Sequence, residues 1–258
     1  MSRRQYHLED VAPRVATHPK GGDIGLRAPD IMHLLLFDID GTLLMPGNNG
    51  RRLMEETLGE LCGQAICSDG VSFSGRTDPA ILHDILLHNR IGAPEPLIPI
   101  ALERYVQRAR QETDPPEVTV LPGVHTLLRR LSAKPTVLLA LLTGNHEVTA
   151  YLKLAAGGLS EYFAFGAFGS DHTDRTRLPA VAARRAQLKT GLTFEDRDIV
   201  VIGDSTLDIS CAQSAGARSI AVCTGMTDRA TLAQQRPDVL LDDLTDSDAF
   251  CRWVLGPL

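Results

Sequence analysis

The sequence predicts an α/β protein whose core has a mainly parallel sheet and is interrupted by an all-helical insertion. From residue 32 onward, apolar runs typical of buried strands alternate with amphipathic helical patterns, which favours a parallel sheet. In one stretch after the first strand, this alternation gives way to helical patterns alone. We therefore divide the chain into an N-terminal tail (1–31), a core (32–46 and 121–258) and a helical insert (47–120).

The composition is that of an ordinary globular protein of 258 residues, with 43% hydrophobic and 22% charged residues. The net charge of −6 argues against nucleic acid or an anionic membrane as the main partner. No apolar run approaches the ~20 residues of a membrane helix. The five cysteines form no CxxC pair, so we interpret them as free thiols and expect a cytoplasmic protein. No pattern in the chain indicates an oligomeric state.

The N-terminal tail, residues 1–31, lacks a clear apolar period and contains Gly21–Gly22 and several prolines. It mixes arginines with acids and has no hydrophobic centre, so it does not resemble a secretory signal peptide. We expect a loose tail or a cover over a strand edge. A start of translation at Met32 is the alternative.

The first predicted strand is the unbroken apolar run Leu34–Phe37, which ends at Asp38 and Asp40. Such a run is typical of a strand buried on both faces. The two carboxylates lie two residues apart and therefore point to the same side, at the edge of the sheet where α/β proteins bind ligands. Because buried like charges need a compensating cation, we predict a Mg²⁺ site here.

Three helices are predicted in the insert, at 51–62, 79–89 and 98–112, and the first two have an apolar stripe at helical spacing. Thr77 or Asp78 can cap the second helix. Arg76 lies in the turn before this cap and could clamp an anionic substrate. The alternative is an ion pair with Asp78 or Asp84 that holds the turn.

After the insert, a helix is predicted at 123–132 and a second buried strand at 136–142, which ends at Thr143, Gly144 and Asn145. A hydroxyl and main-chain N–H groups at a strand-to-helix turn can hold a phosphate. The alternative is that Thr143 or Asn145 merely caps the next helix, at 146–156. Beside the two aspartates of the first strand, we favour the phosphate contact.

The rest of the core is predicted as a short strand at 163–168, a polar loop, a helix from Leu178 and a strand at 198–202. Asp204 follows that strand, and Asp208 lies one helical turn later. Two acids on one helix face repel unless a positive charge lies between them, so we add both to the metal site. Helix capping with macrodipole compensation is the alternative. Strands at 219–223 and 238–241, the helix at 227–234 between them and a terminal helix complete the core.

Three of these segments resemble motifs of the haloacid dehalogenase-like hydrolase superfamily. Asp38–Thr42 looks like its first motif, Thr143–Asn145 like its second and Gly203–Asp208 like its fourth. The resemblance covers roughly residues 32–245 and is best for the phosphoglycolate-phosphatase-like branch. It implies a Rossmann-like core, with the insert as a helical cap that closes over the acids.

One departure from that superfamily concerns a basic residue, often Lys followed by Pro, which its members carry in the region of the polar loop. This chain has no Lys–Pro there. A dianionic phosphoryl group beside several carboxylates requires a fixed positive charge besides the metal. Arg175 is our first choice for it, followed by Arg177 and Lys153.

The resemblance implies a Mg²⁺-dependent phosphatase that hydrolyses a small phosphorylated metabolite, a phosphate monoester, through an aspartyl-phosphate. Asp38 would be the nucleophile and Asp40 the general acid and base. The other implied roles are metal ligation by Asp38, the carbonyl of Asp40, Asp204 and Asp208, and phosphoryl or substrate binding by Thr143, Gly144, Asn145, Arg175 and Arg76. A sugar-phosphate mutase, a receiver-like signalling domain and a catalytically silent binding protein are the alternatives. Dehalogenase relatives lack an aspartate equivalent to Asp40, so its presence favours phosphate esters.

Overall fold

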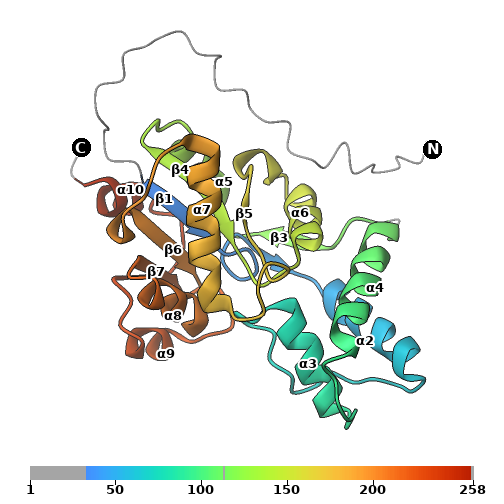
Figure 1. Ribbon diagram of the computed structural model, residues 1–258. Helices are drawn as coiled ribbons and strands as arrows, with labels where there is room; N and C mark the ends of the chain where they lie inside the picture. The colour runs from blue at the N-terminus through green and yellow to red at the C-terminus, as the bar shows by residue number, and fades with distance from the viewer. Residues whose placement is uncertain (1–32, 113, 257–258) are drawn as a thin grey trace, which may run out of the picture.

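The core of the molecule is a parallel sheet with helices on both faces (Figure 1). The computed structural model describes residues 33–112 and 114–256, so the predicted tail at 1–31 lies outside them. The sheet has six strands in the order β5-β4-β1-β6-β7-β8, and each neighbouring pair is parallel. The strands are β1 (His33–Phe37), β4 (Val137–Leu142), β5 (Gly166–Ala167), β6 (Ile199–Gly203), β7 (Arg218–Val222) and β8 (Val239–Leu241).

Strand β1 is buried on both faces. Leu35 and Phe37 belong to an apolar cluster with α5 (Val124–Ser132), α6 (Glu147–Ala156) and α10 (Ser247–Leu255). Leu34 and Leu36 belong to a second cluster, with α7 (Leu178–Thr190) and α8 (Thr206–Ser214). Helix α9 (Arg229–Gln234) packs against β7 in a separate, smaller apolar cluster. Because all four residues from Leu34 to Phe37 are buried, the run shows no polar alternation, as predicted.

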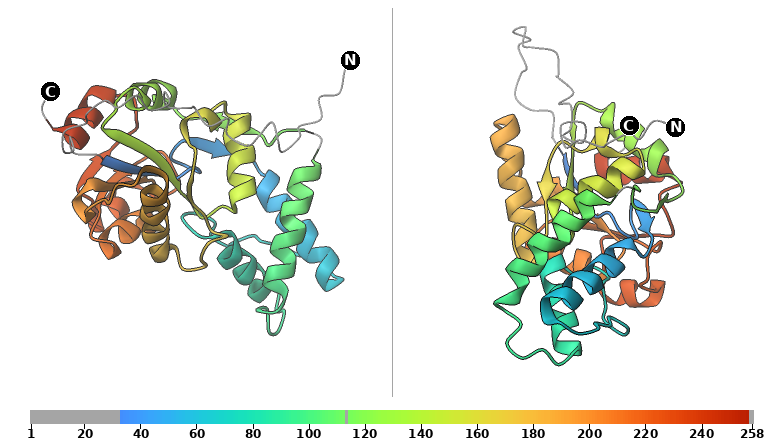
Figure 2. Two further views of the ribbon diagram at one scale, coloured as in Figure 1. Left: turned by 45° about the horizontal axis from the view of Figure 1, so that its top comes forward. Right: turned by 90° about the vertical axis from the view of Figure 1, so that its right-hand side faces the viewer.

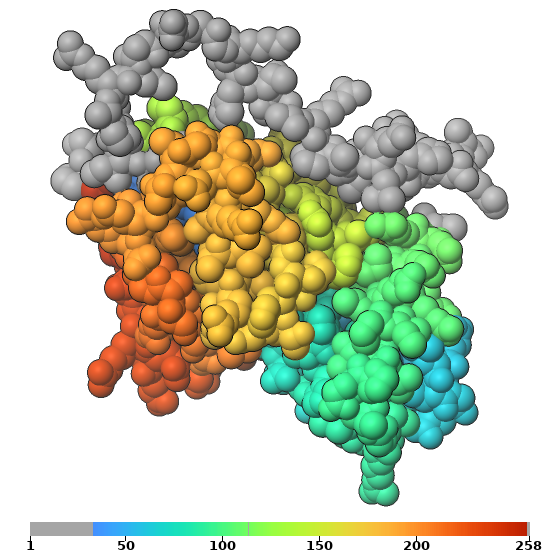
Figure 3. Space-filling view, viewed as in Figure 1, coloured from blue at the N-terminus to red at the C-terminus, as the bar shows by residue number. Residues whose placement is uncertain are grey.

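The insert consists of α2 (Asn49–Cys62), α3 (Asp78–His88) and α4 (Leu97–Gln111), close to the predicted helices. The three helices share an apolar core of their own, which includes Leu58, Ile85 and Tyr105. They lie beside the sheet and do not cover either face (Figure 2), and they form a lobe at the lower right of the space-filling view (Figure 3). The Thr77 hydroxyl accepts a hydrogen bond from the N–H of Ala80, so Thr77 caps α3 as predicted.

A two-stranded antiparallel ribbon, which the sequence did not predict, connects the insert to the core. It pairs β2 (Leu44–Pro46) with β3 (Val118–Val120). The N–H of Gly47 extends the pairing with a hydrogen bond of 2.8 Å to the carbonyl of Glu117. Three-residue strands are too short to show a period, and the nearby prolines indicate a loop. The boundaries between core and insert, placed at 46/47 and 120/121 from the sequence, stay a prediction.

Two local predictions differ from the structure. Only Gly166 and Ala167 of the predicted strand at 163–168 pair with β4, because a 3₁₀ turn at Ser160–Tyr162 precedes it and Phe163 packs into the core. Helix α6 is capped by His146, whose Nδ1 accepts from the N–H of Val148 at 3.1 Å. The alternative that Thr143 or Asn145 caps this helix is therefore wrong.

Among the described residues, none of the helices combines the length and apolarity needed to cross a membrane.

Candidate active site

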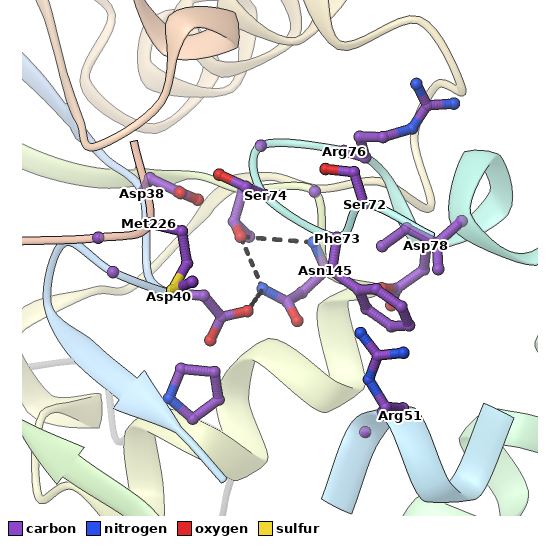
Figure 4. Close-up of a pocket in the computed structure, with 18 of the residues that line it drawn as sticks. Asp38, Asp40, Arg51, Ser72, Phe73, Ser74, Arg76, Asp78, Asn145 and Met226 are labelled. Atoms are coloured by element: carbon purple, nitrogen blue, oxygen red, sulfur yellow. Dashed lines mark hydrogen bonds between the residues drawn. The ribbon is translucent and has the colours of Figure 1, made fainter. Parts of the chain in front are cut away.

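A cavity of about 540 Å³ lies between the carboxyl edge of the sheet and the insert. The core contributes carboxylates, basic groups and the turn after β4, while the insert contributes aromatic, aliphatic and basic side chains (Figure 4). Of the predicted site residues, all but Asp208 line this cavity: Asp38, Asp40, Arg76, Thr143, Gly144, Asn145, Arg175 and Asp204.

Three buried aspartates meet at the base of the cavity. Asp38 follows β1, Asp204 follows the neighbouring strand β6, and Asp208 lies in the first turn of α8. One carboxylate oxygen from each lies within 4.8 Å of those of the other two. The side chain of Asp40 is not part of this cluster, so only its main-chain carbonyl remains as its predicted metal contact. The adjacency of β1 and β6 explains why acids far apart in the sequence converge.

Burial disfavours the charged form of these aspartates. It raises the pKa of the Asp38 carboxyl, an effect that Arg175 opposes and that Asp208 and Asp40 reinforce. Burial also raises the pKa of Asp204, and the charges of Asp208 and Asp38 raise it further. Three carboxylates face one guanidinium, so the ionised cluster carries excess negative charge. This charge and the oxygen donors fit a hard divalent cation such as Mg²⁺.

Arg175 is held at the centre of the acidic cluster and is 6% exposed. Its Nη2 lies 3.1 Å from Oδ1 of Asp38 and donates to Oδ1 of Asp208. Its guanidinium also donates to the main-chain oxygens of Gly75 at 2.9 Å and Leu142 at 3.3 Å. Arg175 therefore lies beside the proposed nucleophile and links it to the insert.

Asp208 has protein partners for both carboxylate oxygens. Oδ1 accepts from Arg175, and Oδ2 accepts from the N–H of Ser205 at 3.0 Å and from its hydroxyl at 2.6 Å. These bonds form a capping box at the start of α8. Helix capping, the predicted alternative to metal binding, thus describes Asp208 well. The carboxylate of Asp204, by contrast, lies beside that of Asp38.

Asp40 is held by a network on the other side of the cavity. Its Oδ2 accepts from Lys153 Nζ at 2.5 Å and from Asn145 Nδ2 at 3.0 Å. The side-chain amide of Asn145, whose bond to Asp40 is drawn in Figure 4, also donates to the Thr143 hydroxyl at 2.8 Å and accepts from Lys153 at 2.7 Å. Of the three residues predicted as candidates for the fixed positive charge, Arg175 lies beside Asp38 and Lys153 lies beside Asp40. Arg177 does not line the cavity, and its side chain is 72% exposed.

The turn before α3 packs directly against the turn after β4. The N–H of Asp78 donates to the carbonyl of Gly144 at 2.8 Å, and Oδ2 of Asp78 accepts from the N–H of His146 at 2.7 Å. A Cβ atom on Gly144 would overlap the carbonyl oxygen of Arg76. Gly144 therefore permits this close approach between insert and core. Burial raises the pKa of Asp78 to about 6, although the hydrogen bond from His146 and the charge of Lys153 oppose the shift.

Arg76 forms an ion pair of 2.6 Å with Asp84, which is one of the two predicted alternatives. Its guanidinium points away from Asp38 and Asp40 in Figure 4, although the residue lines the cavity. Sequence reasoning missed Arg51 as a cavity residue and saw in Asp78 only a cap or a partner for Arg76. Neither the position of Arg51 in the cavity nor the contact of Asp78 with the turn after β4 has a sequence signal, because both depend on how the insert packs onto the core.

Comparison with known proteins agrees with this geometry. Residues 35–222 match the family model described as haloacid dehalogenase-like hydrolase. The chain is 28% identical to a phosphoglycolate phosphatase of Agrobacterium fabrum, over 81% of this chain and 88% of that protein. It is 27% identical to one of Pseudomonas syringae pv. syringae, over 85% of this chain and 79% of that protein.

A solved structure of similar fold is a predicted phosphatase from Clostridium acetobutylicum. It has a TM-score of 0.66 and 19% identity, covering 88% of this chain and all of that one (100%). A likeness at such low identity shows the shared fold alone.

Proposed function

Because the chain belongs to the haloacid dehalogenase-like hydrolase family, we propose that it is a phosphatase of the phosphoglycolate-phosphatase-like branch that hydrolyses a small phosphate monoester. The observation that carries this proposal is the meeting of Asp38, Asp40 and Asp204 in one cavity with Arg175 and the Thr143 turn. The phosphoglycolate phosphatases among its relatives make phosphoglycolate the first substrate to assay.

In the proposed reaction, a carboxylate oxygen of Asp38 attacks the phosphorus atom and forms an aspartyl-phosphate, while the ester oxygen leaves with the alcohol. Asp40 protonates the leaving oxygen and then removes a proton from the attacking water. Lys153 and Asn145 fix the carboxylate of Asp40 for both steps, since both donate to its Oδ2. Water then displaces the phosphate and restores Asp38.

The phosphoryl oxygens are held, in this proposal, by the Thr143 hydroxyl, the N–H of Gly144 and the guanidinium of Arg175. Arg175 is fixed by four hydrogen-bonding and ionic partners, so its charge is in place before the substrate arrives. Asn145 aligns Thr143 through its hydrogen bond. Arg76 lines the same cavity from the insert and remains our proposed substrate contact on that side.

The acidic cluster is our proposed Mg²⁺ site, with Asp38, the carbonyl of Asp40 and Asp204 as ligands and Asp208 in support. Buried carboxylates with raised pKa values are the donors that such an ion would stabilise in their charged form. When bound, the ion neutralises charge on the phosphoryl group and on Asp38.

The test is Mg²⁺-dependent release of phosphate from an aryl phosphate and from phosphoglycolate by the wild type and Asp38→Asn. We expect the substitution to lower kcat by roughly 10³-fold or more, because the nucleophile is lost while the shape of the site is kept. Asp69→Asn, at an exposed position of the insert, is the matched control and should retain wild-type rates. Equal rates for wild type and Asp38→Asn would overturn the proposal.

Incubation with a sugar phosphate separates a phosphatase from a sugar-phosphate mutase. A putative beta-phosphoglucomutase from Bacteroides vulgatus shares the fold, with a TM-score of 0.62 and 17% identity, covering 88% of this chain and 89% of that one. A mutase would convert a sugar phosphate to its isomer, whereas the proposed phosphatase releases inorganic phosphate.

A further inference from the structure

Arg51, in the first turn of α2, presents its guanidinium to the cavity from the insert (Figure 4). Its Nη1 donates to the carbonyl of Ser68 at 2.8 Å and to the Ser68 hydroxyl at 2.5 Å. Its Cζ lies 4.2 Å from the centroid of the Phe73 ring. One edge and one face of the planar group are thus fixed by the protein, which orients its remaining N–H groups.

Ser68 is itself fixed by Glu55. Both the N–H and the hydroxyl of Ser68 donate to Oε1 of Glu55, at 2.8 and 2.5 Å. Because the hydroxyl proton is directed to Glu55, the lone pairs of the Ser68 oxygen face Arg51. Ser68 is fully buried. The position of Arg51 is therefore set by the insert alone, before any ligand enters.

Among the described residues, Arg51 has no direct ion pair, unlike the other basic residues Arg76, Lys153 and Arg175 of the cavity, and reaches the acid Glu55 only through the Ser68 hydroxyl. Arg76 pairs with Asp84, Lys153 with Asp40 and Arg175 with Asp38. Within residues 33–112 and 114–256, Arg51 forms no ion pair with a carboxylate. The cavity thus has an acidic end, at the sheet, and on the insert side a fixed guanidinium without a directly paired carboxylate.

We propose that Arg51 is a specificity-determining residue that binds a second anionic group of the substrate while the phosphoryl group lies at Asp38. The inference rests on the proposed function and names the class of ester: a phosphate monoester with a carboxylate or a second phosphate at its other end. Both groups accept paired hydrogen bonds from a guanidinium. A neutral end displaces water from Arg51 without replacing those bonds, so neutral esters bind more weakly.

The experiment compares three alkyl monophosphates of equal carbon number that end in a hydroxyl, a carboxylate or a second phosphate. Its readout is the ratio of kcat/KM for each charged ester to that for the hydroxyl ester. For the wild type, we expect at least one charged ester to be preferred by about 10- to 100-fold, the range of a charge-assisted hydrogen bond. The two charged esters distinguish a carboxylate site from a phosphate site.

Arg51→Met should bring this ratio close to one, mainly through KM, because the lost contact stabilises ground state and transition state alike. Arg51→Lys should keep part of the preference, since it retains the charge without the planar fork. Arg52→Met is the matched control: Arg52 is the next residue, pairs with Glu56 and Glu112 and does not line the cavity, so the ratio should stay at its wild-type value. The ratio does not depend on the folded fraction of a variant.

A wild type without preference for either charged ester, or an Arg51→Met variant that keeps the wild-type ratio, would overturn the inference. Failure of the proposed function has a different signature, since the wild type would then release no phosphate from any of the three esters or from an aryl phosphate.

Discussion

At the scale of single residues, Asp78 shows how the insert–core contact depends on protonation. Its side chain is 4% exposed and accepts a hydrogen bond from the N–H of His146. Burial raises its pKa from 3.8 to about 6, so the folded protein binds a proton here more tightly than the unfolded chain does. The stabilisation from this group is therefore complete below about pH 4 and is lost as the pH rises toward 6.

Asp78→Asn tests this linkage, because asparagine keeps an oxygen acceptor for His146 without a charge. We expect the variant to exceed the wild type in unfolding free energy by about 1–3 kcal/mol at pH 7.5, and by less at pH 5. Urea unfolding of both proteins at the two pH values measures the difference. A difference that does not change with pH would contradict the assignment.

Which of these residues the sequence could predict follows from their position in the fold. Asp38, Asp204 and Thr143 directly follow central strands, and parallel strands bring such positions to one edge. Their convergence could be predicted from the order of the motifs. The partners of Lys153 and Arg51 could not, because their contacts depend on the rotation of α6 and on the packing of α2 against the segment that carries Ser68 and Phe73.

At the scale of elements, the contact between the turn before α3 and the turn after β4 couples the insert to the proposed phosphate-binding residues. The hydrogen bond from Asp78 N–H to the Gly144 carbonyl lies at its centre, and the Thr77 hydroxyl adds a bond of 2.9 Å to the carbonyl of Thr173. Arg175 adds a third link through Gly75. The structure therefore shows the insert docked onto the core at the site itself.

Gly144→Ala tests that coupling. The added Cβ would overlap the Arg76 carbonyl, so one of the two turns must shift. We expect a loss of about 1–3 kcal/mol in stability, and a lower kcat because Thr143 and Asn145 move with the turn. Thermal unfolding and phosphate release measure the two effects. Gly92→Ala is the control, since its Cβ would have no neighbour within 4 Å, and it should be neutral. Wild-type activity and stability in Gly144→Ala would show that the turns are not coupled.

Long strands and helices could be predicted from the sequence, and short or locally overridden elements could not. The run Leu34–Phe37 and the apolar stripes of α2 and α3 reflect burial over many consecutive residues. The ribbon of β2 and β3 has only three residues in each strand. The strand expected at 163–168 shortens to β5 because Phe163 packs into the core. Tertiary packing decides such elements.

At the scale of the whole molecule, the acidic cluster joins segments that are distant in the chain. Asp38 and Asp204 come from strands separated by the insert, β4 and β5. In the folded protein they lie in one buried group of like charges, which a bound divalent cation would stabilise. Metal binding should therefore stabilise the fold as a unit.

We expect Mg²⁺ at about 100 times its Kd to add about 2.7 kcal/mol to the unfolding free energy, and a chelator to remove both this gain and the activity. Asp204→Asn should lose the gain, yet without metal it should be at least as stable as the wild type, because one repelling carboxylate is gone. Thermal unfolding with and without Mg²⁺ checks both signs, with NaCl of equal ionic strength as the control. An undiminished Mg²⁺ response in Asp204→Asn would exclude this residue as a ligand.

The ribbon of β2 and β3 has a consequence for how such an enzyme diversifies. Leu44 and Val120 lie opposite each other in the ribbon although the three helices of the insert lie between them in the sequence. An insert anchored in this way can be lengthened, shortened or exchanged for an unrelated one without changing the order of the strands in the sheet. Selection for a new substrate can then act on the insert, while the chemistry proposed for the end of β1 is inherited intact.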